Sequence, residues 1–308
     1  MMVYGEDAAA EFLSRWLEGK KQIVLVTGAS SYSACGAADF FAPFLQGLDV
    51  LHLTTTGENA NAQSVEEMGK FLPRKVDGFI AVGGGTVMDT TKLLRGGFPE
   101  APKDEPLAPY LAVPTTAGTG AEATRFAVYY DQGVKKSADN LRYLPTDQVL
   151  ISAFSKTQND YRRACTEFDA YAQAVESLWA KGSTDESRVY AQKALDLMAK
   201  GEQLLGSYWA GRAIDISRTT AAHALSYYMT ATYGIPHGHA VYMMFPYVCR
   251  ANGHPEFIKV VPELETLDVF AQKKGLVREE LIAALLAHVN PQRLANNPQP
   301  ISKETFNG

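Results

Sequence analysis

The chain has 308 residues, and 29 Lys and Arg against 34 Asp and Glu give it a net charge of −5. This length predicts about two domains, and the 46% hydrophobic fraction is typical of a globular protein with a sizeable core. The lack of a basic excess argues against general nucleic-acid binding. No apolar run reaches the roughly 18 to 20 residues of a membrane span, and no signal-peptide pattern begins the sequence. We therefore expect a soluble, cytoplasmic protein.

The first half of the sequence alternates short apolar runs with amphipathic stretches. Strands are predicted over residues 22–28, 50–53, 78–82, 110–113 and 149–151, and helices over 33–47, near 65–72 and from 83 to 94. Such alternation is typical of a parallel, doubly wound sheet. Residues 124–136 instead predict a hairpin that turns at 131–133.

From about residue 161 onward the pattern becomes helical, and strand patterns are no longer found. Helices are predicted over residues 161–181, 185–200, 202–231 and 240–250, with weaker ones to 288 and a polar tail expected to be a loop. This change in pattern predicts an α/β domain over residues 1–156 and an all-α domain over residues 157–308.

The first motif of chemical interest follows the predicted strand at 78–82 and reads GGGTVMDTTK. Its three glycines would let backbone N–H groups approach a phosphate at the start of a helix, where the helix dipole also favours an anion. The motif is neither a Walker sequence nor a strict GxGxxG. The alternative is a tight turn in which glycine only relieves steric crowding.

The second motif, PTTAGTGAE at residues 114–122, also follows a predicted strand. Its hydroxyls and exposed amides suit a ribose or a diphosphate, although an ordinary polar loop would have a similar composition. Two such loops at the carboxyl ends of parallel strands favour a nucleotide site, because doubly wound sheets bind nucleotides at that edge.

The third group of candidate residues lies in the helical half. Asp169 and Gln173 are four residues apart and share a helix face, His223 lies in another helix, and His237 follows a predicted helix break. A carboxylate, an amide oxygen and two imidazoles could hold one divalent ion inside a helical bundle. Each residue alone could equally be an ordinary core or surface side chain.

Together these motifs resemble the iron-containing (group III) alcohol dehydrogenase family. GGGTVMDTTK is similar to that family's GGGSxxDxAK, and VPTTAGTGAEAT is similar to its PTTAGTGSE. TEFDAYAQAVESLWA resembles its helix with a metal-binding aspartate, and HALSYYMTATYGIPHGHA resembles its double-histidine signature. The resemblance implies a dehydroquinate synthase-like fold, with an N-terminal dinucleotide-binding α/β domain and an all-α C-terminal domain.

The resemblance also implies roles for individual residues. The residues implied at the nucleotide are Gly28, Gly83, Gly84, Gly85 and Thr86, with Asp89 and Lys92 nearby and Thr115, Thr116 and Thr119 on the nicotinamide side. The implied metal ligands are Asp169, His223 and His237, with Gln173 at a fourth position where the family usually has histidine. Tyr227 occupies a position where many members carry another histidine, so Tyr227, His239 or water would supply the proton.

The implied activity is reduction of a small aldehyde by NADP or NAD, with Fe²⁺ as the preferred metal and Zn²⁺ as its rival. Gly28 stands where an acid that would repel the 2′-phosphate of NADP is often found. The helix with Gln173 is most similar to a subgroup that resembles phosphonoacetaldehyde reductases, which implies a phosphonate substrate. The family also implies a homodimer or larger homo-oligomer.

Two alternatives remain open from the sequence. One is a dehydroquinate-synthase-like lyase that uses NAD and a metal without net turnover of the nucleotide. The other is a nucleotide-binding relative that has lost its metal and its catalysis, a hypothesis that Gln173 keeps open.

Overall fold

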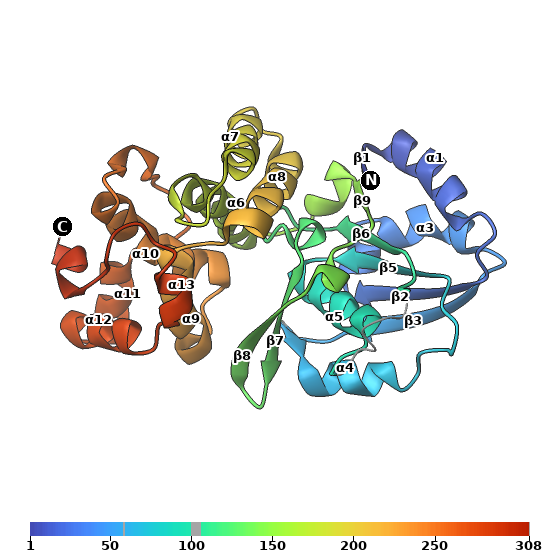
Figure 1. Cartoon of the computed structure of the whole chain (residues 1–308), viewed down its shortest axis with the longest axis horizontal. Helices are drawn as coiled ribbons and strands as arrows, with labels where there is room; N and C mark the ends of the chain where they lie inside the picture. Colours follow the sequence, from blue (N-terminus) through green and yellow to red (C-terminus); the bar gives the residue numbers. More distant parts are fainter. Residues whose placement is uncertain (58, 100–105, 308) are drawn as a thin grey trace. The chain divides into compact units, whose positions relative to one another are not determined.

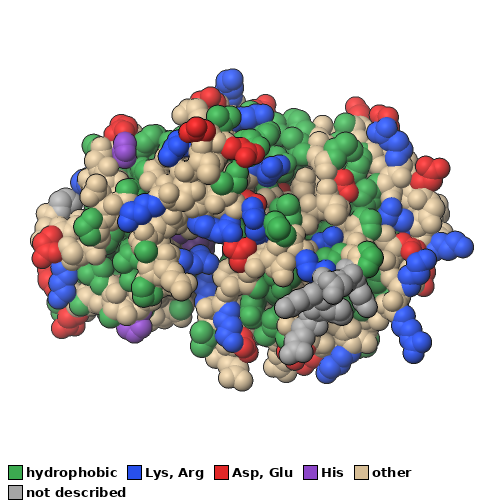
Figure 2. All heavy atoms as spheres, in the orientation of Figure 1, with side chains coloured by type: hydrophobic (Ala, Val, Ile, Leu, Met, Phe, Trp, Pro, Cys, Tyr) green, Lys and Arg blue, Asp and Glu red, His purple; other side chains and the backbone are tan. Residues whose placement is uncertain are grey.

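The computed structural model describes residues 1–57, 59–99 and 106–307. They form two compact units. The first contains residues 1–116 and 120–157, and the second contains residues 117–119 and those from 158 onward. Among the described helices, none combines the length and apolar character that crossing a bilayer requires. On the face drawn in Figure 2, basic and acidic side chains are interspersed, as the nearly balanced charge of the chain would lead one to expect.

The first unit is built on a parallel sheet with helices on both faces (Figure 1). Its strands lie in the order β1-β9-β6-β5-β2-β3, and each pairs in parallel with its neighbours. The elements of this unit in chain order are β1 (Met2–Tyr4), α1 (Glu6–Leu17), β2 (Gln22–Gly28), α2 (Ser31–Ala34), α3 (Ala37–Leu45), β3 (Asp49–Thr55), β4 (Ala60–Asn61), α4 (Ala62–Gly69), β5 (Gly78–Gly83), α5 (Gly85–Gly96), β6 (Tyr110–Pro114), β7 (Phe126–Asp131), β8 (Val134–Asp139) and β9 (Asp147–Leu150).

The strands are continuous apolar runs because both faces of the sheet are covered. Ile23 and Leu25 of β2 pack in the cluster that includes α1 and α3, whereas Val24 and Val26 pack with α4 and α5 on the other face. The chain order of the strands reverses at β2, which has β3 on one side and β5 on the other. In doubly wound sheets the ligand crevice lies at such a switch point, outside the carboxyl ends of the strands.

The predicted hairpin is confirmed as β7 and β8, which pair antiparallel from Phe126–Asp139 to Asp131–Val134. Its two-residue turn consists of Gln132 and Gly133, both with positive φ (50° and 80°). Positive φ at both positions is typical of the type I′ turn, which suits the twist of paired antiparallel strands.

The second unit is helical over its described residues. Its helices are α6 (Asp160–Trp179), α7 (Asp185–Ala199), α8 (Gln203–Ser217), α9 (Ala221–Tyr233), α10 (His237–Ala251), α11 (Leu267–Lys274), α12 (Arg278–Ala287) and α13 (Pro291–Leu294). Its main apolar cluster joins α6, α9, α10, α11 and α12. The change from α/β to all-α structure that the sequence predicts is therefore confirmed.

Two predictions about this unit are wrong in detail. The single helix predicted over residues 202–231 is two helices. The chain breaks at Arg218, whose positive φ of 63° is a backbone conformation that residues with a Cβ rarely adopt. The side-chain amide of Asn296 donates hydrogen bonds to the carbonyl oxygens of Ser217 and Thr219, both at 2.9 Å, and so stabilises the break. The tail expected to be a loop contains α13.

In the first unit, β1 and α1 were not predicted.

Candidate functional site

The glycine- and threonine-rich segments lie together at the carboxyl edge of the first unit's sheet. Gly28 ends β2, Gly83 ends β5, and the N–H of Thr115 donates to the carbonyl oxygen of Gly83 at 3.0 Å. Helix α5 begins at Gly85 without a side-chain cap. Its first N–H groups are therefore available to an anion.

Individual glycines at this edge differ in what they do. A Cβ at Gly83 would lie 2.4 Å from Val87, so packing of α5 against β5 already requires glycine there. A Cβ at Gly84 would reach within 3.3 Å of the side chain of Thr116. Gly84, Gly85 and Thr86 are partly exposed, which leaves this turn accessible to a ligand.

Asp89 and Lys92 have internal partners in the structure. The Lys92 side chain is fully buried, and its Nζ donates to the carbonyl oxygen of Phe126 at 2.7 Å and to Thr124 Oγ1 at 3.1 Å. Asp89 Oδ2 accepts from the N–H of Val128 at 3.0 Å. These contacts fasten α5 to β7, and the structure does not bring the two charged groups to the exposed edge of the sheet.

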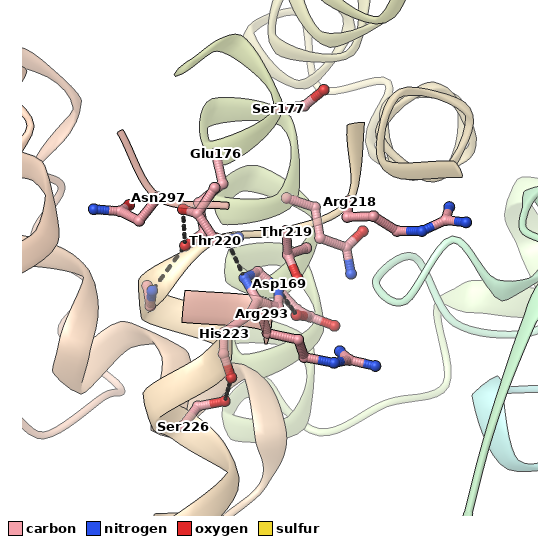
Figure 3. Close-up of polar contacts among 12 residues, drawn as sticks. Asp169, Glu176, Ser177, Arg218, Thr219, Thr220, His223, Ser226, Arg293 and Asn297 are labelled. Atoms are coloured by element: carbon pink, nitrogen blue, oxygen red, sulfur yellow. Dashed lines mark hydrogen bonds and ion pairs between the residues drawn. The ribbon is translucent and has the colours of Figure 1, made fainter. Parts of the chain in front are cut away.

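The candidate metal ligands Asp169, His223 and His237 lie together in the second unit. They come from α6, α9 and the first residue of α10, and their ligand atoms lie within 4.8 Å of one another. Asp169 Oδ1 is 3.1 Å from His223 Nε2 and 3.9 Å from His237 Nε2. Figure 3 shows Asp169 and His223 facing each other across this centre.

Gln173 lies one turn after Asp169 on the same face of α6. Its Nε2 donates to the carbonyl oxygen of Thr119 at 3.3 Å, whereas its Oε1 is buried without a hydrogen-bond partner. A buried acceptor left unpaired costs about 1–3 kcal/mol, and a divalent cation would satisfy it. The carboxylate, the unpaired amide oxygen and the two imidazoles therefore fit one divalent ion.

A residue that the sequence analysis did not single out, Glu176, orients His223. Glu176 Oε2 accepts from His223 Nδ1 at 2.5 Å, and its two oxygens also accept from the N–H and hydroxyl of Thr220 and the N–H of Ala222 (Figure 3). Because Nδ1 is held in this way, Nε2 is the atom that faces Asp169. A carboxylate behind a ligating histidine is a recurrent feature of metal sites.

The charges around His223 favour a cation at this point. Burial lowers the pKa of the imidazole, but Glu176 and Asp169 outweigh it and raise the pKa to about 9. Burial likewise works to raise the pKa of Glu176, yet His223 and the donors from Thr220 bring it below its usual value. The site therefore holds two carboxylates in a buried setting, which requires positive charge between them.

Glu176→Gln is expected to lower metal affinity about 10- to 100-fold, because the neutral amide no longer fixes the histidine with a charge-assisted hydrogen bond. Titration of metal-stripped protein with Zn²⁺ in a competing chelator measures this change. Glu279→Gln, an exposed position in the first turn of α12, is the matched control and should leave the affinity unchanged. Equal affinities for wild type and Glu176→Gln would contradict the role given to Glu176.

The structure places the two candidate proton donors differently. Tyr227 stacks on His237 with ring centroids 5.6 Å apart and planes inclined by 18°, and its hydroxyl accepts a hydrogen bond from Arg293 Nη1. His239 is not brought to the cluster. Its Nδ1 pairs with the hydroxyl of Tyr161 at 2.8 Å, and its Nε2 lies 3.0 Å from backbone atoms of Glu265.

Two family models match the chain. The model described as iron-containing alcohol dehydrogenase matches residues 1–150, and the model described as the C-terminal part of the Fe-containing alcohol dehydrogenase family matches residues 184–290. The second match covers the helices that carry His223 and His237, and the first covers both glycine- and threonine-rich segments.

Individual proteins described as reductases and alcohol dehydrogenases are also similar to the chain. A phosphonoacetaldehyde reductase of Streptomyces viridochromogenes is 32% identical over 58% of this chain and 54% of its own length. An NAD-dependent methanol dehydrogenase of Bacillus methanolicus is 29% identical over 59% of this chain and 52% of its own. The chain thus spans about half the length of these curated relatives. The structure of a sulfoacetaldehyde reductase from Bifidobacterium kashiwanohense in complex with NAD⁺ superimposes with a TM-score of 0.77 at 22% identity, covering 99% of this chain and 94% of that one.

Proposed function

The chain belongs to the iron-containing alcohol dehydrogenase family, and from this premise we propose that it is a metal-dependent, NAD(P)H-linked aldehyde reductase. The observation that carries the proposal is the buried, unpaired Oε1 of Gln173 one helical turn from Asp169. A protein that had lost its metal would have no reason to keep an unsatisfied buried acceptor one helical turn from Asp169.

We propose that residues 1–156 bind the nucleotide and residues 157–308 bind the metal and the substrate. The uncapped start of α5 at Gly85 would hold the pyrophosphate, and Gly28 at the end of β2 would lie near the adenosine ribose. Because Gly28 carries no negative charge, the 2′-phosphate of NADP would meet no repulsion there. Thr115, Thr116 and Thr119 would line the nicotinamide side.

When bound, the divalent ion supplies a Lewis acid for the substrate oxygen and the nicotinamide supplies the hydride. Asp169, Gln173, His223 and His237 would hold the ion, and Glu176 holds Nδ1 of His223, which would leave Nε2 for the ion. Tyr227, which stacks on His237, would give a proton to the oxygen of the reduced product. Its hydroxyl accepts from Arg293, and a phenol can donate a hydrogen bond as well as accept one.

For the substrate, we propose phosphonoacetaldehyde, reduced to 2-hydroxyethylphosphonate. The 32% identity to a phosphonoacetaldehyde reductase supports this choice, together with the segment around Gln173 that resembles the corresponding subgroup.

The test is loss of NADPH or NADH absorbance by purified protein loaded with Fe²⁺ or Zn²⁺ and supplied with a panel of small aldehydes that includes phosphonoacetaldehyde. We expect aldehyde- and metal-dependent oxidation of the nucleotide. Nucleotide binding without oxidation, for every aldehyde and both metals, would contradict the proposal and favour a lyase or an inactive relative.

A further inference from the structure

Arg293 lies beside the metal-ligand cluster on a segment that the sequence predicted as a loop. It belongs to α13, which packs against α9. The side chain of Asn290 accepts hydrogen bonds from the N–H groups of Gln292 and Arg293, at 3.0 and 3.1 Å. Pro291 occupies the first turn, where its fixed φ suits a helix. The backbone of Arg293 is therefore held in place relative to α9.

The guanidinium of Arg293 is linked to the cluster through one aromatic ring. Nη1 donates to the hydroxyl of Tyr227, and Cζ lies 5.1 Å from the centroid of the Tyr227 ring. That ring in turn stacks on His237. In the view of Figure 3 the Arg293 side chain overlaps Asp169 and His223, and its guanidinium points away from their labels.

The positive charge of the Arg293 guanidinium is available to a ligand. The charges of Asp169 and Glu176 would balance a divalent ion. Arg293 is partly exposed, and no described carboxylate forms an ion pair with it. A guanidinium has five N–H donors, and the bond to Tyr227 uses one of them.

We propose that Arg293 recognises the acidic group of the substrate, so that the enzyme prefers short aldehydes that carry a phosphonate or another oxyanion. The planar guanidinium can bind two oxygens of such a group at once, which a neutral aldehyde does not offer. The proposal rests on the proposed function, because it concerns the substrate of that same site. It makes Arg293 a specificity-determining residue and leaves proton donation to Tyr227.

The first experiment compares an anionic and a neutral aldehyde, phosphonoacetaldehyde and butanal, in wild type, Arg293→Met and Arg293→Lys. For phosphonoacetaldehyde, we expect kcat/KM to fall about 10- to 100-fold in Arg293→Met, mainly through KM, and to be partly restored by lysine. For butanal, kcat/KM should fall by a much smaller factor, since the variant then loses only the hydrogen bond to Tyr227 and the ring contact, and no contact with the substrate. Arg188→Met, at an exposed arginine of α7, is the matched control and should change neither value.

A second experiment does not depend on turnover. Calorimetric titration of the metal-loaded protein with ethylphosphonate should show binding by wild type and about 10- to 100-fold weaker binding by Arg293→Met. If Arg293→Met does not fold, the proposal is tested by the kinetics of Arg293→Lys and by the preference of wild type for phosphonoacetaldehyde over butanal. Equal losses for both aldehydes, a wild-type preference for butanal, or ethylphosphonate binding that is unchanged in the variants would each overturn the proposal. Failure of wild type to oxidise NAD(P)H with any aldehyde would instead count against the proposed function, and the calorimetry would still decide on Arg293.

Discussion

Replacing His237 by alanine is expected to lower turnover by about 10³-fold or more, because loss of one proposed ligand would weaken the site that, on the proposed function, stabilises charge on the substrate oxygen. Bound metal should fall well below one equivalent. Nucleotide binding should remain intact, since the proposed nucleotide residues belong to the other unit apart from Thr119. Metal content by atomic emission and NAD(P)H binding by fluorescence measure the two effects separately.

His288→Ala is the matched control for this variant. His288 lies just after α12, where its Nδ1 pairs with a carbonyl oxygen of its own helix and its ring stacks on Tyr228. The change should leave metal content and turnover unaffected. Retained turnover in a metal-free His237→Ala protein would remove the basis for assigning the metal to this cluster.

Gly238→Ala is expected to have the second large effect, this time on both stability and metal binding. A Cβ at this position would lie 1.9 Å from the carbonyl oxygen of Cys165 and 3.1 Å from Cβ of Asp169. The backbone of α6 cannot move aside as a flexible side chain can, so α10 must shift away from α6. We expect destabilisation by about 3 kcal/mol, at the upper end of overpacking effects, and displacement of His237 from Asp169.

Chemical denaturation measures the loss in free energy of unfolding, and metal titration measures the loss of metal affinity. Gly69→Ala is the control, because Gly69 lies in the last turn of α4 without a positive φ, and a Cβ added there would meet no described atom within 4 Å. Alanine there should be neutral or slightly stabilising. A Gly238→Ala protein as stable as wild type would show that α6 and α10 are not in the close contact described above.

Features that depend on local pattern were predictable from the sequence. The apolar runs of β2 and β5, the turn at Gln132–Gly133 and the helix break before His237 each have their cause within a few residues of chain. The spacing of Asp169 and Gln173 likewise placed both side chains on one face of α6. The sequence therefore predicted the fold class, and the family resemblance named the three residues that lie together as the candidate metal site.

Features that depend on distant partners were not predictable. The break at Arg218 is stabilised by Asn296, far along the chain. Glu176 shares a face with Asp169 and Gln173, but its role follows from the backbone at the start of α9, which packs against it only in the folded structure. Lys92 belongs to a motif that resembles a phosphate-binding segment, yet its contacts with β7 bury it.

The central claim is that Asp169, Gln173, His223 and His237 hold one divalent ion that aldehyde reduction requires. The most direct measurement is a titration of chelator-treated protein with Fe²⁺ in the absence of oxygen, with aldehyde-dependent NAD(P)H oxidation followed at each step. We expect activity to be absent at the start and to rise to a plateau at one equivalent, and we expect no such rise in Asp169→Asn. Full activity in the chelator-treated protein, with no response to added metal, would contradict the claim.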